Sequence, residues 1–169
     1  MTVLNAATVA FRPIGTIRTP FQTADGTPIQ PVFGEGVEGE VEVDEAFAGG
    51  LADLEGFERI WLVYALDRAA PGGLLVVPYR DVTARGVFAT RAPSRPNAIG
   101  LSAVRLLGRE GARLRVADLD ILDGTPLLDI KPYVAAFDAY PGARAGWFDR
   151  RPGARTTADG RFHREADDG

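Results

Sequence analysis

The sequence predicts a mainly β domain, built either as a barrel or as a sandwich. Short apolar segments rich in β-branched and aromatic residues recur along the chain, and Gly/Pro turns separate them. No helical pattern is long enough for repeated βαβ units, which argues against a doubly wound nucleotide-binding fold. The 169 residues suit one domain, and 46% of them are hydrophobic, so a core of useful size can form.

Three strands are predicted in the first half of the chain. Residues 9–18 form the first, and residues 37–43 (VEGEVEV) alternate Val and Glu with the period of a half-buried strand. Residues 59–66 (RIWLVYAL) are β-branched and aromatic, which is typical of a strand buried on both faces. Between these strands we expect a loop over residues 19–30 and one or two helical turns over residues 46–54.

The second half of the chain contains shorter strand candidates and a hairpin. Residues 74–77 and 86–90 are apolar enough for two short strands. Residues 100–107 and 112–119 are longer candidates on either side of the turn sequence GREG at 108–111. This arrangement predicts a β-hairpin.

The end of the chain differs in composition from the rest. Residues 150–169 are polar, contain Gly and Arg, and show no periodicity. We therefore expect a mobile C-terminal tail after a domain that spans residues 1–149.

The composition excludes several classes of site. The chain has no cysteine, which removes disulfides, thiolate nucleophiles and Cys-based zinc sites. His163 is the single histidine, so a Ser-His-Asp triad or a multi-His metal site is not expected, and we predict no metal. Chemistry must rest on carboxylates, arginines, hydroxyls, backbone groups or a cofactor. A signal peptide and a long apolar run are both absent from the sequence, so we expect a cytoplasmic protein without a membrane segment.

Charge is distributed unevenly along the chain, although the net charge is only −4. Residues 35–58 contain nine acidic residues and no Lys or Arg. Residues 80–105 contain one acidic residue, Asp81, and five arginines: Arg80, Arg85, Arg91, Arg95 and Arg105. The two segments are either solvated surfaces of opposite sign or, for the second, part of a site that faces an anion.

Residues 86–102 (GVFATRAPSRPNAIGLS) are a candidate binding loop. Pro93 and Pro96 stiffen it and push the residues before them towards extended geometry. A rigid loop can hold Arg91 and Arg95 in fixed positions, which suits guanidinium groups that clamp a carboxylate or a phosphate. The alternative is a surface loop with solvated arginines.

Residues 120–133 (DILDGTPLLDIKPY) form a second candidate segment. Gly124 supplies a permissive turn conformation, and Asp123 can accept hydrogen bonds from a ligand hydroxyl or amine. Lys131 is the only lysine of the chain and stands two residues before Tyr133. The alternative is an acidic turn followed by one surface lysine.

These two segments carry a resemblance to a known family. ATRAPSRPNAIGLSAVRLL and DILDGTPLLDIKPYV resemble the TrmO/TsaA-like family of S-adenosylmethionine-dependent tRNA N6-threonylcarbamoyladenosine methyltransferases. PIGTIRTPF, LEGFERIWLVYALDR and GARAGWF fit the same family, so the similarity covers residues 11–148.

The resemblance implies a small antiparallel β-barrel with few short helices that forms a homodimer and binds S-adenosylmethionine near the subunit interface. It also implies N6-methylation of threonylcarbamoyl-adenosine 37 in tRNA. The cofactor contacts carried over by motif are Pro28, Ile29, Gln30, Asp67, Arg68, Arg91, Leu101, Ile121, Leu122, Asp123 and Gly124.

The predicted substrate contacts are Arg95, Asn97, Lys131 and Tyr133, with basic side chains facing an anionic group of the substrate. No catalytic residue is assigned, because positioning alone can accelerate methyl transfer and neither Asp67 nor Asp123 is favoured as proton acceptor. Asp67 stands where the family usually has a histidine, and the bacterial tRNA-modifying members carry an extra C-terminal region.

Three functions remain open at this point. The first is a tRNA adenosine N6-methyltransferase, and the second is a methyltransferase of a small molecule or another substrate. The third is a non-catalytic S-adenosylmethionine-binding regulator. The basic 80–105 segment favours the first, and tRNA is then the expected partner besides a second copy of the chain.

Overall fold

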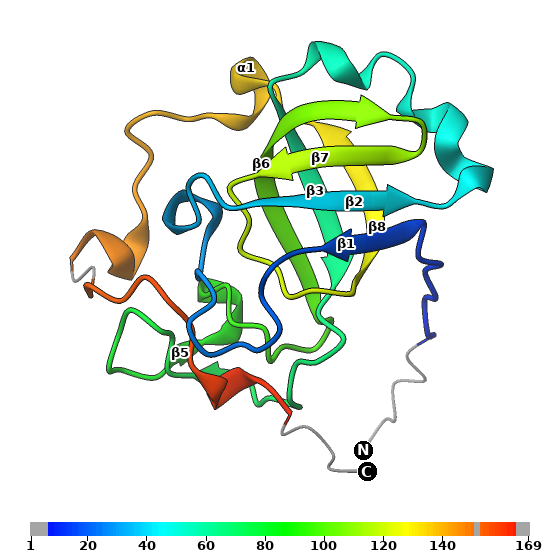
Figure 1. The fold of residues 1–169 in the computed structure, drawn as a ribbon. Coiled ribbons are helices and arrows are strands. Elements are labelled where there is room, and N and C mark those ends of the chain that lie inside the picture. Colours follow the sequence, from blue (N-terminus) through cyan, green and yellow to red (C-terminus); the bar gives the residue numbers. More distant parts are fainter. Residues whose placement is uncertain (1–6, 151–152, 165–169) are drawn as a thin grey trace.

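A computed structural model describes residues 7–150 and 153–164 of the chain, and its centre is a closed barrel of six antiparallel strands (Figure 1). Neighbouring strands around the barrel follow the order β1-β2-β7-β6-β3-β8. The strands are β1 (Gly15–Arg18), β2 (Glu38–Val43), β3 (Arg59–Ala65), β6 (Ile99–Glu110), β7 (Arg113–Ala117) and β8 (Thr125–Pro132). The predicted mainly β fold and the antiparallel barrel are confirmed.

The remaining elements are short. Strands β4 (Leu75–Val76) and β5 (Arg85–Gly86) form a separate two-stranded sheet, and α1 (Ala135–Asp138) is a single helical turn. The 3₁₀ helices are η1 (Pro31–Phe33), η2 (Glu45–Leu51), η3 (Leu54–Gly56), η4 (Val87–Ala89), η5 (Gly146–Asp149) and η6 (Gly160–Phe162). No helix in the described ranges is of the length and apolarity that a membrane crossing requires.

The barrel interior explains the burial pattern of β3. Ile60, Leu62 and Tyr64 point inward and are buried, whereas the residues between them are half-buried on the outer face. The prediction that this strand is buried on both faces is therefore wrong, because a barrel strand has one interior and one exterior face. The interior also contains fully buried side chains from the other five strands: Ile17, Val41, Val104, Leu114, Val116 and Leu127.

The acidic stretch of β2 is explained by its neighbours in the barrel. Glu42 pairs with Arg18 on β1 at 3.1 Å, and Glu40 pairs with Arg113 on β7 at 3.2 Å. These glutamates lie on the outer face, where such solvent-exposed pairs add little stability. For this part of the acidic segment, a solvated surface is therefore the correct interpretation.

Several predicted elements differ from the structure. The first strand begins at Gly15, and no strand forms over residues 9–14. Residues 87–89 are a 3₁₀ turn instead of strand, while the predicted helical turns at 46–54 are present as η2 and η3. The predicted hairpin is present as β6 and β7, with a tighter turn that has Gly111 at φ +60°.

The C-terminal segment is the largest difference from the expected structure. Residues 153–164 pack against the segments at residues 26–29 and 68–80 instead of forming a tail without contacts, and Ala158 and Phe162 are buried. The backbone N–H of Ala158 donates to Thr27 O at 2.7 Å, and Gly26 N–H donates to Ala158 O at 3.1 Å. Residues 151–152 and 165–169 of the expected tail lie outside the described residues. The division of the chain at residue 149 stays a prediction.

A buried carboxylate, that of Asp118, connects the barrel strands β3 and β6 to the loop before β2. It accepts hydrogen bonds from Gly36 N–H at 2.9 Å, from Arg59 at 2.9 Å and from Arg105 at 3.4 Å. Burial raises its pKa, but these hydrogen bonds outweigh burial and hold the pKa below its usual range.

We therefore expect Asp118→Asn to reduce the free energy of unfolding by about 2 kcal/mol at neutral pH, because donors lose their charged acceptor. The contribution of a group with a depressed pKa is lost as pH falls through its folded pKa, so the variant and wild type should converge below about pH 4. Urea denaturation at several pH values measures this difference. Asp129→Asn, which removes an exposed ion pair with Lys131, is the control and should change stability little. An equal loss of stability in the two variants would contradict the stabilising role of the Asp118 hydrogen bonds.

Candidate functional site

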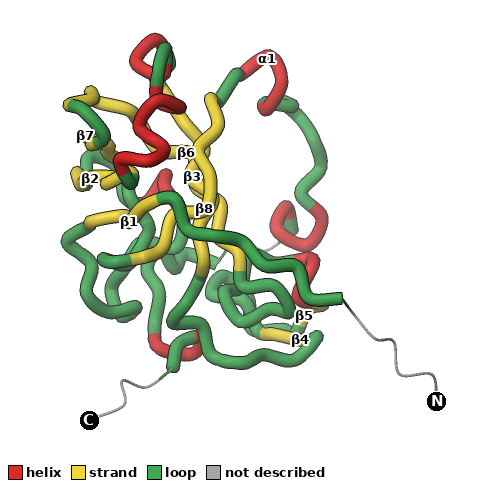
Figure 2. The backbone as a smooth tube through the Cα atoms, turned by 90° about the vertical axis from the view of Figure 1, so that its right-hand side faces the viewer, coloured by secondary structure: helices red, strands yellow, loops and turns green. Residues whose placement is uncertain are grey.

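A large pocket opens at the end of the barrel where β3 ends and β6 and β8 begin. Its volume is about 980 Å³, at the upper end of the range typical of small-molecule sites. Figure 2 shows that the long loops, β4 and β5 gather at this end, while α1 lies at the opposite end. The loops form the walls of the pocket because the short strands leave them free to extend past the barrel.

Most of the residues predicted to bind a cofactor line this pocket. They come from four separate parts of the chain: the loop before η1, the end of β3, the loop and start of β6, and the segment between β7 and β8. The predicted residues in the wall are Pro28, Ile29, Gln30, Asp67, Arg68, Arg91, Leu101, Ile121 and Leu122, together with Arg95 and Asn97 from the predicted substrate set.

Asp123 and Gly124 do not line the pocket but support the residues that do. An Asp123 carboxylate oxygen accepts a hydrogen bond from Thr19 N–H at 3.0 Å. The backbone carbonyl oxygen of Asp123 accepts one from the Arg68 guanidinium at 2.8 Å. Gly124 adopts φ +78°, a conformation that favours glycine, and so reverses the chain into β8. The two residues hold Ile121 and Leu122 in place instead of lining the pocket themselves.

Lys131 and Tyr133 are not brought together with the other predicted site residues. They lie at the end of β8 that is remote from the pocket, near the start of β3, where Lys131 is paired with Trp61 and Tyr133 N–H donates to Arg59 O. Figure 1 shows that β8 runs the length of the barrel. Lys131 pairs with Asp129 at 2.9 Å and is exposed, and Tyr133 packs against Trp61 with ring centroids 5.5 Å apart. Within this chain Lys131 is an exposed surface residue, and its contact with the substrate stays a prediction.

The arginines of the basic segment divide into two groups. Arg91 donates to the Gln30 side chain at 2.6 Å and so connects two walls of the pocket. Arg95 donates to Thr90 O at 3.0 Å and to Ala92 O at 3.3 Å, so it also fixes the conformation of its own loop. Arg80 lines the pocket as well, whereas Arg85 pairs with Asp81 and Arg105 with Asp118.

One side of the pocket is aromatic, which sequence reasoning did not anticipate. Phe88, Trp147 and Phe148 line it, and the Arg80 guanidinium lies 5.3 Å from the centre of the Phe148 ring. The Trp147 indole N–H donates to Ala89 O at 2.8 Å, which attaches η5 to the loop that carries Arg91. The GARAGWF motif was the sequence signal for these aromatic residues. Nothing in the motif indicates that it lies beside the loop at Ala89, which is almost sixty residues earlier.

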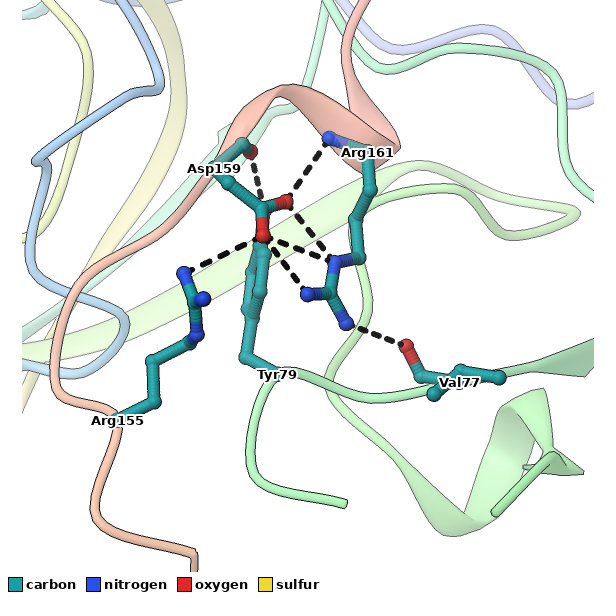
Figure 3. Close-up of polar contacts among 5 residues, drawn as sticks. All are labelled: Val77, Tyr79, Arg155, Asp159 and Arg161. Carbon is teal, nitrogen blue, oxygen red and sulfur yellow. Dashed lines mark hydrogen bonds and ion pairs between the residues drawn. The ribbon is translucent and has the colours of Figure 1, made fainter. Parts of the chain in front are cut away.

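The C-terminal segment completes the pocket and is held by the cluster in Figure 3. The Asp159 carboxylate accepts from Arg161 at 2.7 Å and lies 3.2 Å from an Arg155 nitrogen. The Tyr79 hydroxyl donates to Asp159 O at 3.0 Å, and burial raises the pKa of Tyr79 to about 12, so this donor stays protonated. The cluster joins the segment to the chain between β4 and β5.

His163 therefore belongs to the pocket wall and not to a polar tail. Its Nδ1 is buried and has no hydrogen-bond partner in the described part of the chain. Burial lowers the pKa of His163, so the ring is neutral at physiological pH. Among the described residues, no group of three or more His, Cys, Asp or Glu side chains is placed to hold a metal.

A chain of three polar side chains also reaches the pocket and was missed from the sequence. Ser102 Oγ donates to Asp120 Oδ1 at 2.6 Å, and the Tyr64 hydroxyl lies 2.9 Å from Ser102 Oγ. Tyr64 and Asp120 line the pocket. The available signal was that Asp120 opens the DILDGTP motif, although Ser102 and Tyr64 of this chain of side chains lie on β6 and β3.

The fold and site together define a small β-barrel domain with a ligand pocket at one end, bordered by arginines, carboxylates and aromatic rings. The chain belongs to the family described as tRNA-methyltransferase O N-terminal domain, whose family model matches residues 16–139. The predicted membership of the TrmO/TsaA-like family is confirmed.

Relatives and solved structures agree with this family. The chain is 51% identical over 156 residues to a probable S-adenosyl-L-methionine-binding protein of Pyrococcus abyssi, covering 91% of this chain and 85% of that protein. It is 34% identical over 154 residues to the tRNA (adenine(37)-N6)-methyltransferase of Escherichia coli, covering 85% of this chain and 66% of the enzyme. A crystal structure of TrmO from Pseudomonas aeruginosa superposes with a TM-score of 0.73 at 41% identity, over 86% of this chain and 65% of that chain.

Proposed function

We propose that this protein is an S-adenosylmethionine-dependent methyltransferase that methylates N6 of threonylcarbamoyl-adenosine 37 in tRNA. The observation that carries the proposal is the convergence of four sequence segments, each predicted from the family motifs, on one pocket. The names of the relatives support the methyl donor and the class of acceptor. Cytoplasmic localisation follows from this proposal, because tRNA is the substrate.

The chemistry of the pocket fits the methyl donor, which supplies an electrophilic methyl group on a sulfonium. Ile29, Leu101 and Leu122 offer apolar surface for the adenine ring. Arg68 and Arg91 suit the carboxylate of the methionine part, since guanidinium groups bind carboxylates through paired hydrogen bonds. The carboxylates of Asp67 and Asp120 in the wall suit the sulfonium and the ammonium group of the donor.

The aromatic side of the same pocket fits a nucleobase. Single-stranded RNA is recognised mainly by stacking of exposed bases on aromatic and Arg side chains. Phe88, Trp147 and Arg80 provide such groups, and Arg95 provides a cation for a phosphate or for the threonyl carboxylate. An anticodon-loop base that leaves its stack can therefore reach the aromatic side of the pocket.

We further infer that the active assembly is a homodimer with the pocket near its interface. Ile99, Leu101 and Phe88 line the pocket, yet their exposed fractions in the single chain are 43%, 53% and 77%. Apolar surface of this kind at the edge of a site is typical of a partner contact, and twofold dimers are the commonest soluble assemblies. Light scattering should give twice the 18.1 kDa mass of the chain at micromolar concentration, and a monomer would contradict the inference.

The function is tested by incubating the protein with a donor labelled in its methyl group and with tRNA that carries threonylcarbamoyl-adenosine. Nucleosides are then separated and identified by mass spectrometry. Label on N6 of the modified adenosine supports the proposal. If donor binding is intact but no tRNA accepts label, a small-molecule methyltransferase or a non-catalytic regulator replaces it.

Arg95→Gln gives a more specific test of the tRNA contact. We expect tRNA binding to weaken, and the slope of log affinity against log salt to fall in magnitude by about one, because one phosphate contact is lost. Glutamine retains an N–H group that can bond to Thr90 O, so the loop is preserved. Donor affinity measured by calorimetry should change little. An unchanged salt slope would contradict the assignment of Arg95 to the tRNA surface.

A further inference from the structure

Asp120 lies in the pocket wall and is held by Ser102, which is in turn hydrogen-bonded to Tyr64. Ser102 on β6 is buried and donates its single hydroxyl proton to Asp120 Oδ1 at 2.6 Å. The Tyr64 hydroxyl on β3, 2.9 Å from Ser102 Oγ, must then act as the donor in that contact. This leaves a hydrogen-bonded chain that ends on a carboxylate at the pocket surface.

The other carboxylates considered as proton acceptors are less suited to that role. Asp67 is exposed and is already paired with Arg68, whose guanidinium lies 3.7 Å from its carboxylate. Asp123 is not part of the pocket lining and accepts a backbone hydrogen bond from Thr19. Geometry therefore separates Asp120 from the two candidates that the sequence offered.

The surroundings of Asp120 favour a carboxylate that can take up a proton near neutral pH. Burial raises its pKa to about 7, while the Ser102 hydrogen bond and the charge of Arg91 act in the opposite direction. Burial also raises the pKa of Tyr64 above its usual range, so Tyr64 stays neutral. The other charged or titratable groups that line this pocket are Asp67, Arg68, Tyr79, Arg80, Arg95 and His163.

We propose that Asp120 is a catalytic residue that accepts the proton of the acceptor nitrogen during methyl transfer, with Ser102 and Tyr64 as positioning residues. The inference rests on the proposed function. As the acceptor nitrogen bonds to the methyl carbon, the carbon–sulfur bond breaks and its electron pair stays on sulfur. The nitrogen–hydrogen bond breaks, and its proton passes to the Asp120 carboxylate. The positive charge of the sulfonium and the negative charge of the carboxylate are thereby lost together.

This role has a pH signature with a defined sign. The carboxylate is the active form, so the rate of methyl transfer should rise with pH and reach a plateau above the pKa of Asp120. Ser102→Ala removes a hydrogen bond that lowers this pKa, so the inflection should move to higher pH. Activity of this variant should then recover at alkaline pH, which a purely structural role of Ser102 would not produce.

The experiment measures single-turnover methyl transfer to threonylcarbamoyl-modified tRNA between about pH 5.5 and 9 for wild type, Asp120→Asn and Ser102→Ala. Calorimetry with S-adenosylhomocysteine reports donor-site binding for each protein. Carbon-13 NMR of the labelled Asp120 carboxyl, assigned by comparison with Asp120→Asn, reports its titration without any turnover. Asp129→Asn, in the middle of β8 and outside the pocket lining, is the control.

We expect Asp120→Asn to slow transfer by about a hundredfold or more, the size of a general-base contribution, with S-adenosylhomocysteine affinity within about threefold of wild type. The Asp120 carboxyl should titrate near neutral pH and at higher pH in Ser102→Ala. A wild-type rate in Asp120→Asn, a pH-independent wild type, or an affinity loss that accounts for the whole rate loss would each overturn the inference. A wild type that labels no tRNA would instead overturn the proposed function, and this inference with it.

Discussion

Arg91→Ala should weaken S-adenosylhomocysteine binding by about tenfold to a hundredfold, the largest effect that we expect from a single pocket arginine. Its guanidinium bonds to the Gln30 side chain and lies in a wall shared with Leu101 and Leu122. A hydrogen bond to a charged group contributes about 1.5–3 kcal/mol, and each 1.4 kcal/mol corresponds to a factor of ten in affinity.

The matched control for this prediction is Arg113→Ala, which removes an arginine from the outer face of β7. It should leave the affinity unchanged. Calorimetric titration of the three proteins measures both effects. Equal affinities for wild type and Arg91→Ala would show that Arg91 does not contact the donor.

Gly100→Ala should reduce the free energy of unfolding by about 3 kcal/mol, because its new methyl group would overlap the ring of Tyr64 on the neighbouring strand. Tyr64 is buried and cannot move aside without disturbing its contact with Ser102. We therefore expect the substitution to affect both stability and the pocket wall.

Gly108→Ala on the same strand is the control, because a methyl group there meets open space. It should be neutral or stabilise by up to about 1 kcal/mol, since alanine is less costly than glycine in a strand. In the Tyr64→Ala background, Gly100→Ala should reduce the free energy of unfolding by much less. Guanidinium denaturation of this double-mutant set measures the effect, and equal costs at positions 100 and 108 would contradict it.

Local patterns predicted much of the barrel. The Val/Glu alternation of β2 and the turn between β6 and β7 depend on neighbours in sequence, so the sequence reveals them directly. Strand β8 was not predicted, because its segment contains Pro126 and Pro132 and proline is uncommon within strands. The ends of β1 depend on which neighbouring strands are available, which no local pattern shows.

The candidate site was predictable only where motifs carried it. Residues of the Arg91 loop and the segment before β8 converge as the family motifs imply. Asp120 was missed because its role depends on Ser102 and Tyr64 from other strands. Lys131 lies away from the pocket of its own chain because β8 separates it from Gly124, which their closeness in sequence does not reveal. His163 was assigned to a tail because the contacts that attach its polar segment to the rest of the protein are with residues far away in sequence.

We propose that this pocket holds the methyl donor beside Asp120. A crystal structure of the protein with S-adenosylhomocysteine tests it most directly. We predict electron density for one molecule per chain between residues 28–30, Arg91 and residues 121–122, with its sulfur on the side of the pocket that Asp120 faces. Density at another place on the protein, or a sulfur that points away from Asp120, would contradict the account.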